Sequence, residues 1–200
     1  MATNKTIEGW GDVDLRMMKR INEINEMEDE MEKMIALVAL FNHMKEDDVL
    51  ELPLDEFKKH MAALGWMDTP PEISMPREEY VINGNTYVLT MNFHKLTTAQ
   101  YLDFQSYAKS KEWEQMLSVF LIPKGKSYNN GYDVYEVQKD LLDMPVGEVL
   151  GLMGFFTVLY RSWSAALLRY SSRMLRRERT KEAKQMRKAL DRAADMFGFR

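Results

Sequence analysis

Three histidines, His43, His60 and His94, are the only imidazole groups in the chain that could do acid–base or metal chemistry. Glu56 stands four residues before His60, a spacing that places two metal ligands on one face of a helix. No second pair accompanies them, because His43 lies on a different element and the sequence HExxH is absent. A surface pair is the favoured interpretation, and we expect no metal site.

Other catalytic patterns also fail. The stretch PKGKS ends like a phosphate-binding loop, but Phe120 stands where that loop requires its first glycine. The chain has no cysteine, which removes thiolate nucleophiles, disulfides and cysteine zinc fingers together. Asp47 and Asp48 are paired carboxylates in a polar turn, where capping explains them. We therefore predict that the protein is not an enzyme and binds no cofactor.

The elements that would carry a binding function are amphipathic helices. From Val13 to about Met44, apolar residues recur mostly at spacings of three and four, which predicts one or two helices with an acidic opposite face. The chain has 17 methionines, whose flexible thioethers fill irregular cores or form surfaces that accept varied apolar partners. Core filling is favoured for Met31, Met61 and Met153, and both interpretations stay open for the wider stripe with Met17 and Met18. The predicted partner contacts are Met17, Ile21, Ile24, Met27, Met31, Met34, Phe57, Met61, Val149 and Met153.

Two stretches around a proline resemble each other, VLELPLDEFKKHM at 49–61 and LLDMPVGEVLGLM at 141–153. Proline is tolerated at the first position of a helix, so each stretch predicts a turn and then a helix, the first one running to about Leu64. We interpret them as copies of one helical unit, with chance similarity between amphipathic helices as the competing explanation. The apolar positions that match are Leu50 with Leu142, Leu52 with Met144, Leu54 with Val146, Phe57 with Val149, and Met61 with Met153.

A linker and a hairpin separate the two copies. DTPPEISMP breaks the periodicity with three prolines. EYVINGNTYVLTM predicts a β-hairpin with an Asn-Gly turn at 83–84, in which Tyr80, Ile82, Tyr87 and Leu89 share one face. Two strands alone are marginal, so the hairpin must pack on helices or on a strand of another chain.

The second half opens with Thr97 three residues before Gln100, the spacing of a capping box. WEQMLSVFLIP predicts a buried helix, and KGKSYNNGYDVYEVQKD an inserted loop. The predicted fold is mainly α, with two related helical units joined by a Pro-rich linker and a β-hairpin. Its predicted segments are the first unit at 1–68, the linker and hairpin at 69–94, the second unit at 95–163 and a basic C-terminal helix at 164–200.

The net charge of −4 hides an asymmetry. Residues 161–200 carry twelve Lys or Arg against four Asp or Glu, a balance of +8 that leaves −12 on residues 1–160. Such a helix could meet DNA, RNA, an acidic protein or the acidic body of its own oligomer. The run interleaves acids and lacks stacking aromatics, so a solvated helix is favoured over nucleic acid. Its basic residues include Arg173, Arg176, Arg177, Arg179, Lys184, Arg187 and Lys188.

No membrane contact is expected. The first ten residues, MATNKTIEGW, contain no apolar segment typical of a secretory signal. The longest uncharged apolar run, Val149 to Tyr160, is well short of the ~20 residues that span a bilayer. A buried helix is the better interpretation of that run.

A family resemblance is carried by MIALVALFNHMKEDDVLELPLDEFKKHMAALGWM in the first half and by LTTAQYLDF, LSVFLIPKGKSYNNGYDV and DMPVGEVLGLMGFF in the second. Over about Trp10 to Tyr170 the chain resembles the tail assembly chaperones of tailed bacteriophages, especially those of phages that infect Bacteroides-like hosts. The resemblance implies a mostly helical protein of the host cytoplasm that binds the helical tape measure protein, brings tail tube subunits to it and is absent from the finished particle.

The chain departs from the commoner pattern of that family in its apparent duplication and its basic C-terminal helix. These departures leave a second hypothesis open, a structural or packaged virion protein whose basic helix contacts DNA or an acidic protein. Whether the two halves pack within one chain or exchange between chains of a homo-oligomer is left open.

Overall fold

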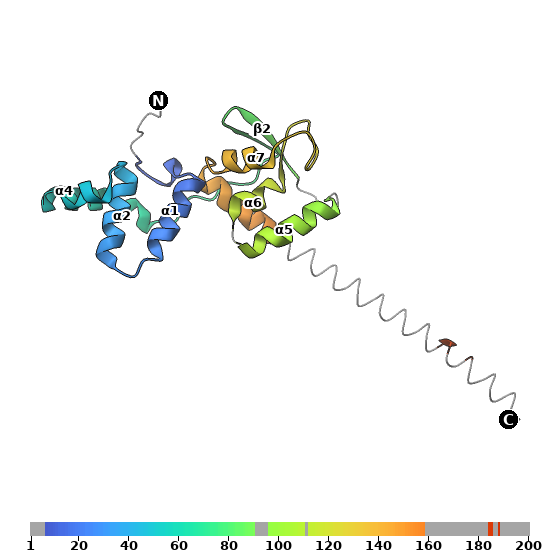
Figure 1. Ribbon diagram of the computed structural model, residues 1–200, viewed down its shortest axis with the longest axis horizontal. Helices are drawn as coiled ribbons and strands as arrows, with labels where there is room; N and C mark the ends of the chain where they lie inside the picture. The colour runs from blue at the N-terminus through green and yellow to red at the C-terminus, as the bar shows by residue number, and fades with distance from the viewer. Residues whose placement is uncertain (1–6, 91–95, 111, 159–183, 186–187, 189–200) are drawn as a thin grey trace, which may run out of the picture. The chain divides into compact units, whose positions relative to one another are not determined.

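The computed structural model describes residues 7–90, 96–110, 112–158, 184–185 and 188 (Figure 1). The chain divides into two compact units, Met1–Phe155 and Phe156–Arg200. The first unit is mainly helical and contains a three-stranded antiparallel sheet, which confirms the predicted helical class and adds a third strand to the predicted hairpin. Among the described residues, no helix combines the length and apolar content needed to cross a membrane. The four predicted segments stay a prediction.

Short helices make up the first half of the first unit. They are η1 (Trp10–Asp12), α1 (Leu15–Asn25), α2 (Glu30–Asn42), α3 (Glu46–Leu50), α4 (Leu54–Ala63) and η2 (Gly65–Asp68). The amphipathic stretch forms two helices because Asp14 and Asp29 each cap a new one, with side chains that accept from backbone amides of the first turn. His43, at φ 53°, ends α2 in the left-handed conformation.

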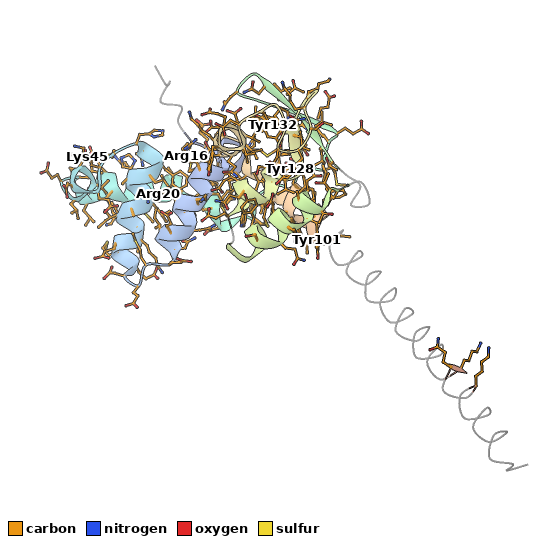
Figure 2. All side chains as sticks on the ribbon, turned by 45° about the vertical axis from the view of Figure 1, so that its right-hand side comes forward. Arg16, Arg20, Lys45, Tyr101, Tyr128 and Tyr132 are labelled. Atoms are coloured by element: carbon orange, nitrogen blue, oxygen red, sulfur yellow. The ribbon has the colours of Figure 1, made fainter. Side chains whose placement is uncertain are left out.

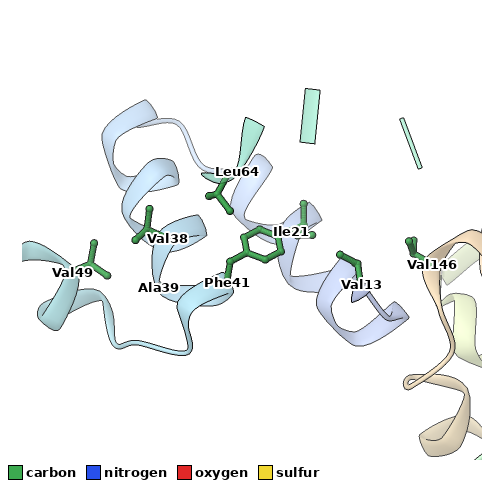
Figure 3. Close-up of a cluster of buried hydrophobic side chains, with 8 residues drawn as sticks. All are labelled: Val13, Ile21, Val38, Ala39, Phe41, Val49, Leu64 and Val146. Atoms are coloured by element: carbon green, nitrogen blue, oxygen red, sulfur yellow. The ribbon is translucent and has the colours of Figure 1, made fainter. Parts of the chain in front are cut away.

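These helices share one core that also includes Val146 from the second half (Figure 3). Trp66 of η2 packs against this core. Its ring is edge-on to the rings of Trp10 and Phe41, with centroid distances of 5.1 and 5.3 Å. The buried members of the cluster are Val13, Ile21, Val38, Ala39, Phe41, Val49, Leu64 and Val146.

The predicted hairpin is confirmed, as β1 (Glu79–Ile82) and β2 (Asn85–Leu89). Asn83 and Gly84 form its turn at φ 50° and 80°, the positive values that favour Asn and Gly there. The four side chains predicted to share a face, Tyr80, Ile82, Tyr87 and Leu89, are all buried.

The hairpin pairs with a third strand of the same chain. Strand β3 (Leu121–Pro123) runs antiparallel to β2, which is therefore the central strand. The prediction of one helix over WEQMLSVFLIP is wrong in its last part, because α6 (Trp113–Ser118) ends before β3 begins. Valine, phenylalanine, leucine and isoleucine at 119–122 fit a buried strand as well as a helix, and pairing with β2 decides between them.

The remaining helices are α5 (Thr98–Ser110), α7 (Val134–Leu141) and the helix over residues 146–158. Thr97 and Gln100 form the predicted capping box, since each backbone amide donates to the other's side-chain oxygen, at 3.0 and 3.2 Å. Only the first part of the predicted inserted loop is a loop, because Asp133 caps α7 within it. Helix α6 packs between α5 and α7 (Figure 1).

The two proline-containing stretches share a pattern of hydrogen bonds to the proline carbonyl. We call residues 46–63 the first Pro element and residues 134–155 the second Pro element. The carbonyl oxygen of Pro53 accepts hydrogen bonds from the amides three and four residues later, at 2.9 and 3.0 Å, and that of Pro145 does the same at 3.0 and 3.1 Å. Pro53 was predicted as the first residue of its helix. It is the N-cap residue instead, and α4 begins one residue later, at Leu54. That the two elements are copies stays a prediction.

Candidate partner-binding surfaces

The apolar stripe of α1 and α2 divides between core and surface. Ile21 and Ile24 are buried, so the structure assigns these two predicted contacts to the core. Met27 lies in the turn between the helices and Met31 in the first turn of α2, and they expose 38% and 56% of their surface. The core-filling interpretation of Met31 is therefore wrong. These two methionines, which we call the methionine tip, are the members of the stripe that another protein can reach best. Met17 and Met34 are half-buried.

The methionine tip is surrounded by carboxylates. Glu26, Glu28 and Glu32 are exposed on the same turn and the start of α2. Glu30 is also exposed but pairs with Lys33 at 2.7 Å. An apolar partner with basic residues beside its apolar side chains would complement this surface.

The first Pro element also leaves apolar side chains exposed. Helix α4 has no fully buried residue, and Leu50 and Leu54 each expose 65% of their surface. Phe57 and Met61, two of the predicted contacts, are half-buried against the core cluster. The sequence showed that Leu50 and Leu54 match positions in the second stretch, but it did not predict that they are exposed. Periodicity alone does not tell which face of a short helix is covered.

In the second Pro element, apolar residues of the helix after Pro145 are buried instead. Val149 is fully buried, so this predicted contact is a core residue, while Met153 is half-buried. Linker residues 72–74 lie directly on the helix, where Ser74 N donates to the carbonyl of Gly147 at 3.0 Å. A Cβ atom at Gly147 or Gly151 would collide with a linker carbonyl, so these glycines allow the close approach.

A polar cluster joins the hairpin to α7. The Asp140 carboxylate accepts from Asn83 Nδ2 at 3.1 Å, Asn85 Nδ2 at 2.7 Å and the Tyr87 hydroxyl at 2.5 Å. Burial raises the pKa of Asp140, but these hydrogen bonds outweigh it and hold the pKa below its ordinary 3.8. Burial and the bond to Asp140 raise the pKa of Tyr87. The cluster joins the hairpin to α7, and no sequence pattern indicated it.

Asp143 extends the cluster to α1. Its carboxylate accepts from Arg16 Nη2 at 2.8 Å and from Asn83 Nδ2 at 2.9 Å (Figure 2 labels Arg16). Burial raises the pKa of Asp143, and the bonds from Arg16 and Asn83 more than offset this and lower it. Arg16 therefore connects α1 to the turn before Pro145 by an ion pair with Asp143 and by a backbone hydrogen bond from its amide to the carbonyl of Leu142.

A second ionic contact fixes α1 to α6. Lys19 Nζ donates to Glu112 Oε2 at 2.6 Å and to Glu114 Oε1 at 2.7 Å. Burial lowers the pKa of Lys19, but the two carboxylates outweigh it and raise the pKa. The Lys19 and Glu112 side chains are 36% and 39% exposed, so this contact positions α1 on α6 but adds little to stability.

The candidate chemical groups stay apart. Among the described residues, no cluster of three or more His, Asp or Glu side chains could hold a metal ion. His43 is exposed and His60 half-buried, while His94 lies outside the described residues. Lys124, beside the loop that resembles a phosphate site, pairs with Glu79 at 2.8 Å.

The basic C-terminal residues are only partly described. Lys184 and Lys188 are helical and exposed. The other predicted tail residues, Arg173, Arg176, Arg177, Arg179 and Arg187, lie outside the described residues.

Comparisons with known proteins return no relative. No protein-family model matches the chain, and neither a curated protein nor a solved structure is significantly similar to it. The surfaces described above are therefore interpreted on their own chemistry.

Proposed function

We propose that the protein is a binding protein of phage morphogenesis, a tail assembly chaperone that captures an apolar helical partner. The observation that carries the proposal is the methionine tip, where Met27 and Met31 are exposed among carboxylates. Exposed methionines adapt to differently shaped apolar partners at little conformational strain. The resemblance described from the sequence implies the tape measure and tail tube proteins as the partners and the host cytoplasm as the place of action.

The binding mode in this proposal is capture of an amphipathic helix. The partner's apolar side chains would cover the methionine tip, and the glutamates around it would orient basic residues beside them. Phe57 and Met61 of the first Pro element would extend the contact, because both are half-buried and so accessible in part. The two Pro elements are proposed to be copies of one unit, which their shared hydrogen-bond pattern supports.

Copurification from phage-infected cells tests the proposal. The double variant Met27→Glu and Met31→Glu should lose a long helical partner that the wild-type chain retains, because two charges would be buried at the contact. The control is Met75→Glu, since Met75 is 86% exposed and lies in the linker, outside α1, α2 and the turn between them. Equal recovery of the partner by the double variant and the control would contradict the proposal.

The alternative function is a virion protein whose basic C-terminal segment contacts DNA or an acidic protein. The observation that favours it is the balance of +8 on residues 161–200. Binding through phosphates weakens steeply with ionic strength, whereas apolar capture does not. Mass spectrometry of purified particles separates the two functions, because only the virion protein would be found there.

A further inference from the structure

The turn before Pro145 contacts the segment Val13–Arg16, in which Val13 and Asp14 are extended and Leu15 and Arg16 are the first residues of α1. Leu15 N donates to the carbonyl of Met144 and Arg16 N to that of Leu142, both at 2.9 Å. Val146 N donates to the carbonyl of Val13 at 2.8 Å, which completes a short antiparallel bridge. The bridge buries the side chains of Val13 and Leu15 completely or nearly so.

The equivalent groups before Pro53 are open. Within the described part of the chain, the carbonyls of Leu50 and Leu52 and the amide of Leu54 have no hydrogen-bond partner. Leu50 and Leu54 are largely exposed, and residues 53–56 are exposed throughout. We call residues 50–54 the first Pro turn and residues 142–146 the second Pro turn.

Both Pro turns carry an acidic residue at the same position. Arg16 of the bound segment pairs with Asp143 of the second Pro turn at 2.8 Å. Glu51 occupies the corresponding place in the first Pro turn and is exposed. A segment that binds there would therefore place a basic residue opposite Glu51.

We infer that the first Pro turn is a docking site for a segment of a different protein in which an extended chain leads into a helix. The four residues of this segment would be an apolar residue, any residue, an apolar residue, and Arg or Lys. Backbone pairing along residues 50–54 would supply the affinity, and the apolar and basic positions the specificity. The chain's own segment Val13–Arg16 has this pattern but already occupies the second Pro turn. The site is separate from the methionine tip, so either proposal can fail alone.

A peptide with the sequence of residues 9–20, GWGDVDLRMMKR, is the probe. Labelled with fluorescein and titrated with the full chain, it should show saturable binding by fluorescence anisotropy. Glu51→Arg should weaken this binding about tenfold, since attraction to the peptide's arginine becomes repulsion. A peptide in which that arginine is replaced by glutamate should restore binding to the Glu51→Arg chain.

Two further variants make the result unambiguous. Glu78→Arg changes the net charge equally at an exposed site on the hairpin side of the chain, and should bind the peptide like the wild type. Leu54→Asp should lose binding through the apolar contact, which keeps the test valid if Glu51→Arg does not fold. Equal binding by wild type and Glu51→Arg, a loss shared by Glu78→Arg, or no saturable binding to the wild type would overturn the inference. Self-association of the chain that Leu54→Asp abolishes would also overturn it, because a second copy would then be the occupant.

Discussion

Leu54 of the first Pro element exposes 65% of its surface, whereas Val146, at the same place in the second Pro element, exposes none. Both proline carbonyls accept hydrogen bonds from the amides three and four residues later. The second Pro element differs because two distant segments cover it, residues 13–16 on one side and linker residues 72–74 on another. Burial here depends on neighbours that are far away in the sequence.

Small residues decide where one of those neighbours can lie. Gly147 and Gly151 let the linker backbone approach the helix, and the matching positions of the first Pro element are Asp55 and Lys59. A charged side chain at these places would both block the approach and lose its hydration. The same periodic pattern therefore yields one covered helix and one helix with an open face.

Of the substitutions that test the difference between the two Pro elements, Gly151→Ala should lower the free energy of unfolding most. Its methyl group would collide with the carbonyl of Ser74, so we expect the free energy of unfolding to fall by about 3 kcal/mol, despite the better helix propensity of alanine. Urea unfolding followed by tryptophan fluorescence measures the change. Lys59→Ala, the matched control at an exposed position, should change stability by less than about 0.5 kcal/mol. A stabilised Gly151→Ala chain would show that the linker does not lie on this helix.

Val146→Ala should have the next largest effect. It removes two methyl groups from the core cluster and leaves a cavity, which we expect to lower the free energy of unfolding by about 2 kcal/mol. Leu54→Ala removes more atoms from the matching position but should cost less than about 0.5 kcal/mol, because the leucine is mostly exposed. Equal losses in the two variants would mean that the first Pro turn is covered in the protein in solution.

Asp140→Asn should have the smallest effect and a distinct pH dependence. Three hydrogen bonds reach this carboxylate, so we expect a loss of about 1 kcal/mol at pH 7. Because the pKa of Asp140 is held below 3.8 in the folded chain, the ionised group stabilises the fold fully above that value and loses this contribution as the pH falls through the lowered pKa. Unfolding curves at pH 7 and at pH values below 3.8 should therefore show the variant and wild type converging in acid.

The control for Asp140 is Asp48, which has the same place in the first Pro element. Among the described residues, the Asp48 carboxylate accepts one hydrogen bond, a long one of 3.3 Å from Lys45 N. Asp48→Asn should change stability by less than about 0.5 kcal/mol at pH 7. A larger loss for Asp48→Asn than for Asp140→Asn would contradict the assigned role of the cluster.

Sequence patterns that act over a few residues were good predictors. The Asn-Gly hairpin turn and the capping box at Thr97 were confirmed in detail because each depends on local backbone geometry. The strand over residues 121–123 was missed, since a short apolar run favours helix and strand alike until a neighbouring strand pairs with it.

The candidate site was predicted less well than the fold. Periodicity identified the apolar stripe but not which of its members face the core, so Ile21, Ile24 and Val149 were named as contacts and are buried. The cluster around Asp140 joins residues 53 to 57 positions apart, and no spacing rule connects an asparagine in a turn with an aspartate on a later helix.

The sequence by itself determined the helical class, the hairpin and the proline turns, because these follow from backbone preferences and apolar spacing within a few residues. Only the tertiary structure decided which proline turn is covered, which apolar side chains stay exposed and which charges pair. Those properties depend on contacts between residues far apart in the sequence, such as Val13 and Val146, which are 133 positions apart (146 − 13). Local preferences do not specify such contacts.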